Sequence, residues 1–205
     1  MQSIKMNLID RVDTFAQVIK NSFCTDANHH PLDMEETMTS IMYDLTELRA
    51  RHHALYIVGN GGSAAVASHA LVDFVNVAKI RTHVLHESSL ITCMANDYHY
   101  ENAYSRALSI YIQPEDLLIA ISSSGKSANI CNAVQVAKQQ GIKVLTLTGF
   151  NQDNPLRRLG DINIWLNSHD YGYVEVGHQF ILHNLSDRFG IEHVKHIANI
   201  EQMRV

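Results

Sequence analysis

The chain has 205 residues, enough for one domain with a substantial buried core. Its content of 46% hydrophobic and 18% charged residues is ordinary for a globular protein. The formal net charge of −5 argues against a nucleic-acid-binding surface, and no apolar stretch approaches the roughly 20 residues that cross a membrane. Three widely spaced cysteines, and a polar N-terminus without the apolar core of a signal peptide, predict a cytoplasmic protein.

Two helices are predicted in the N-terminal segment, residues 1–53. Apolar residues at helical spacing indicate a helix over Met6–Ser22, and a polar loop over Asp26–Pro31 follows. A second helix over Asp33–Arg51 begins with Asp33 as its N-cap. The methionine- and leucine-bearing faces of this helical hairpin would pack either on its own sheet or on other copies of the chain.

From residue 54 to residue 189 the pattern alternates between strands and helices. Short apolar runs predict five strands, at Leu55–Val58, Thr82–Leu85, Leu117–Ser122, Lys143–Thr148 and Ile162–Leu166. Helical patterns stand at Ala64–Val77, Ser89–Asn96, Tyr100–Tyr111, Ala128–Gln140 and Val174–Phe189, with a helical turn at Pro155–Leu159. The alternation predicts an α/β fold, a parallel sheet covered by helices, in which ligands bind beyond the carboxyl ends of the strands. Residues 190–205 form a tail that could hold a short helix.

The segment after the first strand has the composition of an anion-binding turn. Gly59-Asn60-Gly61-Gly62-Ser63 follows an apolar strand and precedes a helix. Glycines let a ligand approach the backbone, and the N–H groups and dipole at a helix start favour phosphate. A plain strand-to-helix connection would look similar. Because the turn lacks the lysine of a Walker loop and the spacing of a dinucleotide fingerprint, we expect a small phosphorylated metabolite rather than a nucleotide.

The chain repeats this arrangement after the third strand. Ser122-Ser123-Ser124-Gly125-Lys126-Ser127 again joins an apolar strand to a helix. An N-cap needs a single serine, and four serines within six residues exceed that need. Both turns therefore favour a phosphate site at the carboxyl edge of one parallel sheet.

Two predicted helices carry titratable residues at helical spacing. His69 and Asp73 are four residues apart, and Glu175, His178 and His183 lie within about 140° of arc on the last helix. Such groups could hold Zn²⁺ or move a proton between adjacent carbons of a sugar. Alternatively, His69 and Asp73 form a surface pair, and His178 or His183 is a core histidine bonded to a backbone carbonyl.

Taken in order, these motifs resemble the phosphoheptose isomerases, which are sugar isomerase (SIS) domain proteins. The resemblance covers about Met38 to Phe189 and rests on the two turns, His69, Asn96-Asp97-Tyr98, Ala128-Asn129 and Leu145–Gly149. It implies a single SIS domain with a five-stranded parallel sheet, whose N-terminal helices join a homotetrameric core. It also implies an isomerase that interconverts sedoheptulose 7-phosphate and an aldoheptose 7-phosphate.

The same resemblance implies the roles of individual residues. Contacts to the sugar phosphate and its hydroxyls would come from Asn60, Gly61, Gly62, Ser63, Asp97, Ser122, Ser123, Ser124, Ser127 and Glu175. A zinc ion would be held by His69, Asp73, Glu175 and His183, of which Asp73 and His183 are the candidates for proton transfer.

Three positions depart from the family pattern. Asp73 stands where the family has glutamate, Glu175 where it has glutamine, and Val77 where well-known members have arginine. These changes resemble a branch found with surface-polysaccharide genes, which would place the protein in lipopolysaccharide or surface-polysaccharide biosynthesis. Two other functions stay open: a non-catalytic module that binds phosphosugars or a protein partner, and an isomerase of hexose or pentose phosphates.

Overall fold

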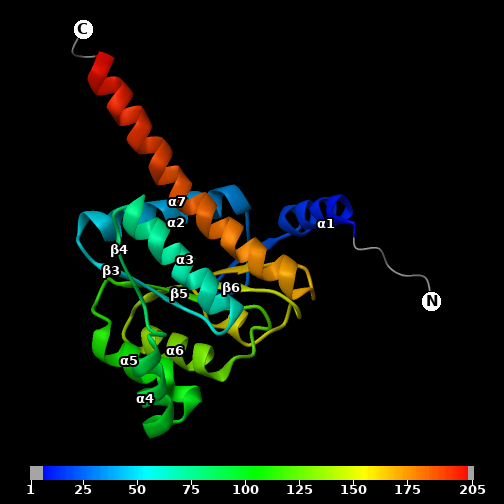
Figure 1. The fold of residues 1–205 in the computed structure, drawn as a ribbon, viewed down its shortest axis with the longest axis vertical. Helices are drawn as coiled ribbons and strands as arrows, with labels where there is room; N and C mark the ends of the chain where they lie inside the picture. Colours follow the sequence, from blue (N-terminus) through cyan, green and yellow to red (C-terminus); the bar gives the residue numbers. More distant parts are fainter. Residues whose placement is uncertain (1–6, 203–205) are drawn as a thin grey trace.

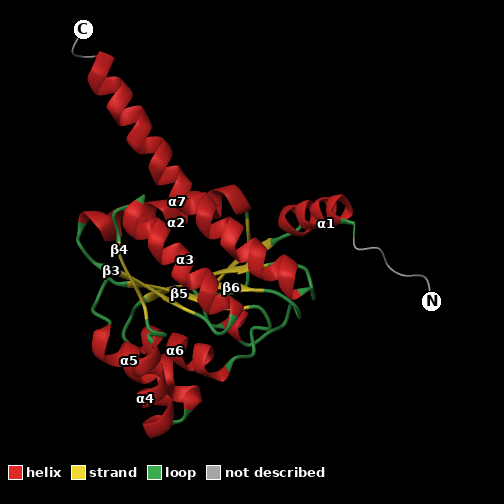
Figure 2. Cartoon of the chain, viewed as in Figure 1, coloured by secondary structure: helices red, strands yellow, loops and turns green. Residues whose placement is uncertain are grey.

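A seven-stranded sheet lies between two layers of helices. The computed structural model describes the backbone of residues 7–202 and the side chains of residues 7–190. The strand order is β2-β1-β7-β6-β5-β3-β4. Helices α1, α2, α3 and α7 cover one face of the sheet, and α4, α5 and α6 cover the other (Figures 1 and 2).

The five predicted strands form the parallel part of the sheet, as expected for an α/β fold. They are β3 (Ala54–Val58), β4 (Arg81–Val84), β5 (Leu117–Ser122), β6 (Lys143–Thr148) and β7 (Ile162–Trp165). Their side chains alternate between two apolar cores, because successive residues of a strand point to opposite faces. In β3, Leu55 and Ile57 enter the core under α3 and α7, whereas Tyr56 and Val58 enter the core on the α5–α6 side.

A β-hairpin replaces part of the predicted polar loop, so the expected strand number of five is wrong. Strand β1 (Phe23–Asp26) pairs antiparallel with β7 and with β2 (Pro31–Leu32). The hairpin separates the two N-terminal helices, which are therefore not a simple helical hairpin. The local sequence gave little signal, since these strands are short and β1 gains its stability by pairing with a strand from the far end of the chain, with Cys24 opposite Ile164.

The predicted helices are present with small shifts of their bounds. They are α1 (Leu8–Lys20), α2 (Met34–Ala50), α3 (Gly62–Asn76), α4 (Ser88–Tyr98), α5 (Ala103–Tyr111) and α6 (Ala128–Gln139), with 3₁₀ turns η1 (Tyr100–Asn102) and η2 (Leu156–Arg158). Asp33 caps α2 as predicted, because its Oδ1 accepts a hydrogen bond from the Glu36 backbone N–H at 3.0 Å.

The last helix is longer than the sequence predicted. Helix α7 (Tyr171–Gln202) starts before Val174 and continues through most of the expected tail, of which residues 203–205 lie outside the described residues. Asp170 caps its start, since its Oδ1 accepts hydrogen bonds from the backbone N–H groups of Gly172 and Tyr173. The guanidinium of Arg11 on α1 binds the same carboxylate at 3.2 Å and so ties α1 to the start of α7.

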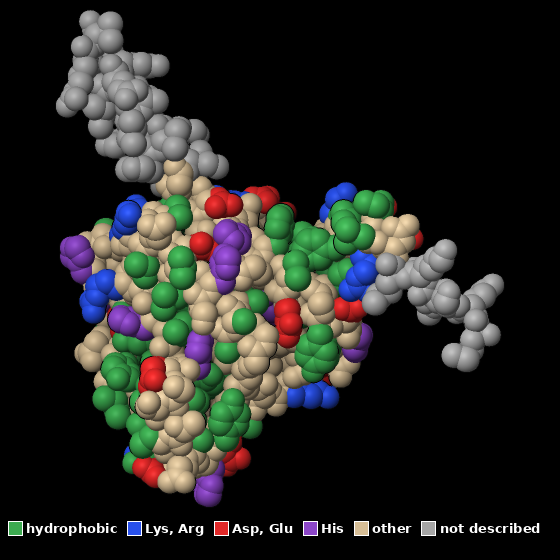
Figure 3. Space-filling view, viewed as in Figure 1, with side chains coloured by type: hydrophobic (Ala, Val, Ile, Leu, Met, Phe, Trp, Pro, Cys, Tyr) green, Lys and Arg blue, Asp and Glu red, His purple; other side chains and the backbone are tan. Residues whose placement is uncertain are grey.

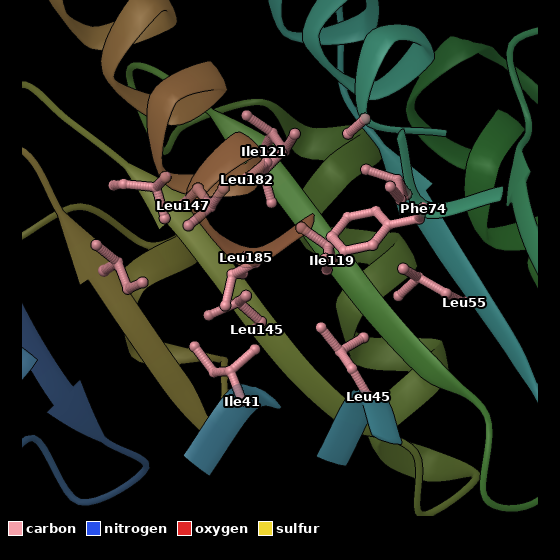
Figure 4. Packing of buried hydrophobic residues seen from close by; sticks show 14 of the residues in the cluster. Ile41, Leu45, Leu55, Phe74, Ile119, Ile121, Leu145, Leu147, Leu182 and Leu185 are labelled. Carbon is pink, nitrogen blue, oxygen red and sulfur yellow. The ribbon is translucent and has the colours of Figure 1, made fainter. Parts of the chain in front are cut away.

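The larger core lies between the sheet and helices α2, α3 and α7. Figure 4 shows Ile41 and Leu45 of α2, Phe74 of α3, and Leu182 and Leu185 of α7 pointing towards the sheet. There they meet apolar side chains of the strands, such as Leu55 of β3, Ile119 of β5 and Leu145 of β6. Close packing of this kind supplies most of the favourable free energy of folding. Within the described residues, no helix has both the length and the apolar composition to traverse a lipid bilayer.

We predict that Leu45→Ala lowers the free energy of unfolding by about 2–5 kcal/mol, because Leu45 is fully buried and its truncation leaves a cavity. Tyr43→Ala, on the exposed side of the same helix, is the control and changes it by less than about 0.5 kcal/mol. Urea unfolding followed by circular dichroism measures both. Equal effects of the two substitutions would contradict the position of α2 over the sheet.

Candidate functional site

The two predicted turns meet in one pocket at the carboxyl edge of the sheet. The pocket has a volume of about 250 Å³ and is lined by the first turn, the serine turn and the start of α7. Except for Asp97, every residue predicted to contact a sugar phosphate lines it, namely Asn60, Gly61, Gly62, Ser63, Ser122, Ser123, Ser124, Ser127 and Glu175. Ile121 and Tyr171 complete the lining. We call this cavity the serine pocket.

Two helix N-termini open into the serine pocket. Helix α3 starts after Gly61, whose φ of 52° suits glycine, and α6 starts after Ser127. Neither capping residue closes its helix with a side-chain hydrogen bond. The first N–H groups of both helices, at the positive ends of their dipoles, can therefore donate to an anion.

A hydrogen-bonded network fixes the first turn. The side-chain amides of Asn60 and Asn129 donate to each other's oxygens at 2.8 and 2.9 Å, and the Tyr100 hydroxyl donates to Asn60 Oδ1 at 2.8 Å. The buried Tyr104 hydroxyl donates to the Gly59 carbonyl at 2.7 Å, and burial raises the pKa of Tyr104, which keeps it protonated. The sequence analysis did not single out either tyrosine. It included Asn129 among the residues that resemble the family but assigned it no role.

The serine turn presents hydroxyl groups without adding charge. Ser122 Oγ and Ser127 Oγ lie 3.1 Å apart, and Ser124 Oγ accepts a hydrogen bond from the Lys126 backbone N–H. The buried Ser123 hydroxyl has no hydrogen-bond partner within residues 7–190. A buried polar atom without a partner is uncommon in folded proteins, and here a bound ligand would supply one.

Glu175 faces the first turn from α7. A Cβ atom added to Gly62 would lie 2.4 Å from Glu175 Oε1, so the carboxylate packs directly against the backbone of the turn and would have to move if Gly62 carried a side chain. Of the described residues that line the serine pocket, Glu175 alone carries a formal charge. The carboxylate can accept hydrogen bonds from hydroxyl groups, and its negative charge repels an anion bound directly beside it.

A histidine–aspartate cluster lies between α3 and α7. His69 Nε2 and His183 Nε2 are 2.9 Å apart, and Asp73 Oδ2 lies 3.4 Å from the first and 3.5 Å from the second. Figure 3 shows histidine and acidic side chains gathered over these two helices. Asp73 Oδ2 is buried and has no hydrogen-bond partner among residues 7–190. The three donor atoms lie within 4.8 Å of one another, so they could hold a metal ion.

Glu175 does not join this cluster. Three of the four predicted metal ligands converge, while the Glu175 carboxylate lies beside Gly62 in the serine pocket. Asp187 Oδ1 lies 4.0 Å from His183 Nδ1 instead, where a carboxylate can orient the imidazole.

His178 is a core histidine, one of the two alternatives open from the sequence. Its side chain is fully buried, and Nε2 donates to the Thr148 backbone carbonyl at 3.2 Å. Burial lowers its pKa to about 4, so the imidazole is neutral near pH 7.

Asp97 lies outside the serine pocket. Its exposed carboxylate at the end of α4 accepts a hydrogen bond from Asn96 Nδ2 at 2.9 Å. A substrate contact of Asp97 stays a prediction.

We predict that stability falls as the pH drops from about 6.5 towards 4. The unfolded chain binds a proton at His178 in this range while the folded protein does not, so up to about 3 kcal/mol is lost at the low end. His178→Gln should flatten this part of the pH profile of the free energy of unfolding, whereas His30→Gln, at an exposed site, should not. Identical profiles for wild type and His178→Gln would contradict the neutral buried imidazole.

Comparisons with known proteins agree with this geometry. Residues 35–149 match the family model of the SIS domain. The phosphoheptose isomerase of Pelobacter propionicus is 30% identical over 161 residues, which cover 76% of this chain and 85% of that protein. The phosphoheptose isomerase of Mycobacterium tuberculosis is 34% identical over 148 residues, 69% of this chain and 72% of that protein.

A solved structure shares the fold. The phosphoheptose isomerase of Francisella tularensis superposes with a TM-score of 0.75 at 21% identity, over 90% of this chain and 98% of that one. With the SIS-domain match over more than half of the chain and the identity to curated relatives, this chain belongs to the SIS-domain proteins and, within them, to the phosphoheptose isomerase family of enzymes.

Proposed function

We propose that the chain is an aldose–ketose isomerase that acts on sedoheptulose 7-phosphate or a closely related phosphosugar. One observation carries this proposal: the serine pocket and the His69–Asp73–His183 cluster are built on the same two helices, α3 and α7. The names of the curated relatives support the substrate class.

The serine pocket suits the phosphoryl end of such a substrate. Backbone N–H groups at two helix starts and serine hydroxyls donate to phosphate oxygens without a lysine or arginine. His69 follows Ser63 by six residues and His183 follows Glu175 by eight, which correspond to about 9 and 12 Å along the helix axes. A phosphosugar held at the serine pocket can therefore extend its reacting carbons towards the cluster.

The cluster fits a divalent cation. Two imidazole nitrogens and one carboxylate oxygen form a donor set that zinc accepts, and the buried Asp73 Oδ2, which has no hydrogen-bond partner among residues 7–190, is the kind of atom that a cation would satisfy. We propose that His69, Asp73 and His183 would hold a Zn²⁺ ion, whose positive charge would stabilise negative charge that develops on a substrate oxygen. The position of Glu175 favours a contact with a sugar hydroxyl, and joining the cluster would require its side chain to turn.

Asp73 and His183 are the proposed proton-transfer groups. Moving a carbonyl between C1 and C2 requires a base that removes a proton from one carbon and an acid that returns it to the other. Asp73 has a second carboxylate oxygen and His183 has Nδ1 available besides the atoms that face the cluster centre. Each side chain can thus contribute one atom to the cluster and still exchange a proton through the other.

We expect Asp73→Asn and His183→Gln each to lower kcat by at least about 10²-fold, the usual contribution of a general acid or base. An NMR time course with sedoheptulose 7-phosphate, run with and without added zinc, follows the conversion. Circular dichroism of each variant should match that of the wild type, since both side chains are partly exposed between α3 and α7 and neither belongs to the apolar core.

Asp13→Asn on α1 and His83→Gln on β4 are matched controls, because both remove the same functional groups at exposed sites outside the cluster. The catalytic assignment is wrong if both cluster variants keep rates near that of the wild type. A wild-type protein that binds heptose, hexose and pentose phosphates but converts none of them would favour a non-catalytic phosphosugar-binding module.

We also propose a homo-oligomer, a tetramer by family resemblance. Apolar side chains that are each more than half exposed gather on the layer formed by α1, α3 and α7, namely Leu8, Ile9, Val12, Val72, Val176 and Phe180. Figure 3 shows hydrophobic side chains over these helices. An exposed apolar face of this kind is typical of a surface that another chain covers.

Val72→Asp combined with Val176→Asp should shift the protein towards monomers in sedimentation velocity, because buried carboxylates would oppose association. Ile110→Asp serves as the control, since Ile110 is at least as exposed but lies on α5, on the other face of the sheet. A wild-type monomer, or an oligomer insensitive to the double substitution, would contradict the proposed interface.

A further inference from the structure

A second hollow lies outside the candidate site, between the loop after β6 and the turn of the β1–β2 hairpin. Its volume is about 440 Å³, and its lining is His29, Gln152, Asp153, Arg157 and Arg158. Two guanidinium groups and an imidazole face a single carboxylate, so the lining is positive on balance. It shares no residue with the serine pocket or the histidine–aspartate cluster. We call it the arginine hollow.

The one carboxylate in the arginine hollow is already paired. Arg158 Nε donates to Asp153 Oδ1 at 3.0 Å, and a terminal N–H of the same guanidinium also bonds that oxygen. The guanidinium of Arg158 lowers the pKa of Asp153 through these hydrogen bonds and its charge. The carboxylate is therefore ionised near pH 7 and offsets the charge of Arg158.

Arg157 carries a buried charge that no carboxylate among residues 7–190 contacts directly, and the charge of Asp153 acts on it only from a distance. It is 8% exposed, Nη1 donates to the Gln152 carbonyl at 2.8 Å, and the guanidinium lies over the Trp165 ring. Its Nε–H has no hydrogen-bond partner, and no carboxylate lies within ion-pair distance, in the part of the chain whose side chains are described. Burial lowers the pKa of Arg157, which reflects the cost of holding this cation away from water. An anion in the hollow would reduce that cost.

We propose that the arginine hollow is a second anion-binding site that takes the phosphoryl group of a small metabolite. The hydrogen bonds described above leave Nη2 of Arg157 and Nη1 of Arg158 without a partner among residues 7–190, so each guanidinium can donate to a phosphate oxygen through that nitrogen. His29 lines the same hollow. The hairpin turn that carries His29 is held by Asp26, whose Oδ1 accepts hydrogen bonds from the backbone N–H groups of Asn28 and His30 at 2.8 Å. The hairpin wall of the hollow is thus held in place by hydrogen bonds within the chain.

The loop that bears the two arginines rests on the serine turn. The Asn154 side chain is fully buried, and its Oδ1 accepts the Arg157 backbone N–H at 3.0 Å. A Cβ atom on Gly125 would lie 1.9 Å from that same Oδ1, and the Leu156 N–H donates to the Gly125 carbonyl at 3.0 Å. An anion that draws Arg157 towards it therefore acts on a loop in direct contact with the serine pocket.

Equilibrium dialysis with radiolabelled inorganic phosphate tests the arginine hollow in the full-length protein. We expect the wild type to bind a second equivalent of phosphate, which persists when Ser122→Ala and Ser124→Ala weaken the serine pocket. Arg158→Gln should weaken this second equivalent roughly tenfold by removing charge-assisted hydrogen bonds and leaving Asp153 unpaired. Asp153→Asn should strengthen it, because the opposing carboxylate is gone.

Arg51→Gln is the matched control. It removes another exposed arginine, one that is paired with Glu47 and Glu115, and it should leave both equivalents of phosphate unchanged. Opposite effects of Arg158→Gln and Asp153→Asn are not expected from a merely structural ion pair, whose two partners would lose stability together. A single equivalent in the wild type that is lost with the serine substitutions, or a second one insensitive to Arg158→Gln and Asp153→Asn, would overturn the proposal.

Discussion

The parallel register of β3 and β5 is the constraint on which the candidate site depends. Val58 pairs with Ala120, so the two strands end at the same edge and their turns face one another. Helices α3 and α6 start from these turns and bring the positive ends of two dipoles to one cavity. The positive potential at the serine pocket thus comes from the backbone, since no lysine or arginine is among the described residues that line it.

Helix α7 connects the serine pocket to the cluster. Glu175 faces the pocket, His178 enters the core, and His183 meets His69 and Asp73 from α3. The hydrogen bond from His178 to the Thr148 carbonyl fixes the rotation of α7 over the sheet. A buried structural contact therefore sets which residues of this helix reach the proposed substrate and which reach the proposed metal.

The features that could be predicted were those encoded locally. Glycine and serine turns between apolar strands and amphipathic helices identified the parallel sheet and almost the whole lining of the serine pocket. The β1–β2 hairpin was missed because its pairing with β7 is not visible in a short window of sequence. A helical wheel placed Glu175, His178 and His183 on one side of the last helix, within an arc of about 140°. In the structure this arc faces the serine pocket, the apolar core and helix α3, and which residue meets which depends on the elements packed against α7.

The unpredicted hairpin also changes how the sheet meets solvent. Without it, β7 would present a row of unpaired backbone groups beside its buried apolar residues, a template for pairing with another chain. Instead the edge strand on this side of the sheet is β2, which has only two residues. One of them is Pro31, which has no backbone N–H to donate. The hairpin that supplies His29 to the arginine hollow therefore also prevents another chain from adding a strand to this edge of the sheet.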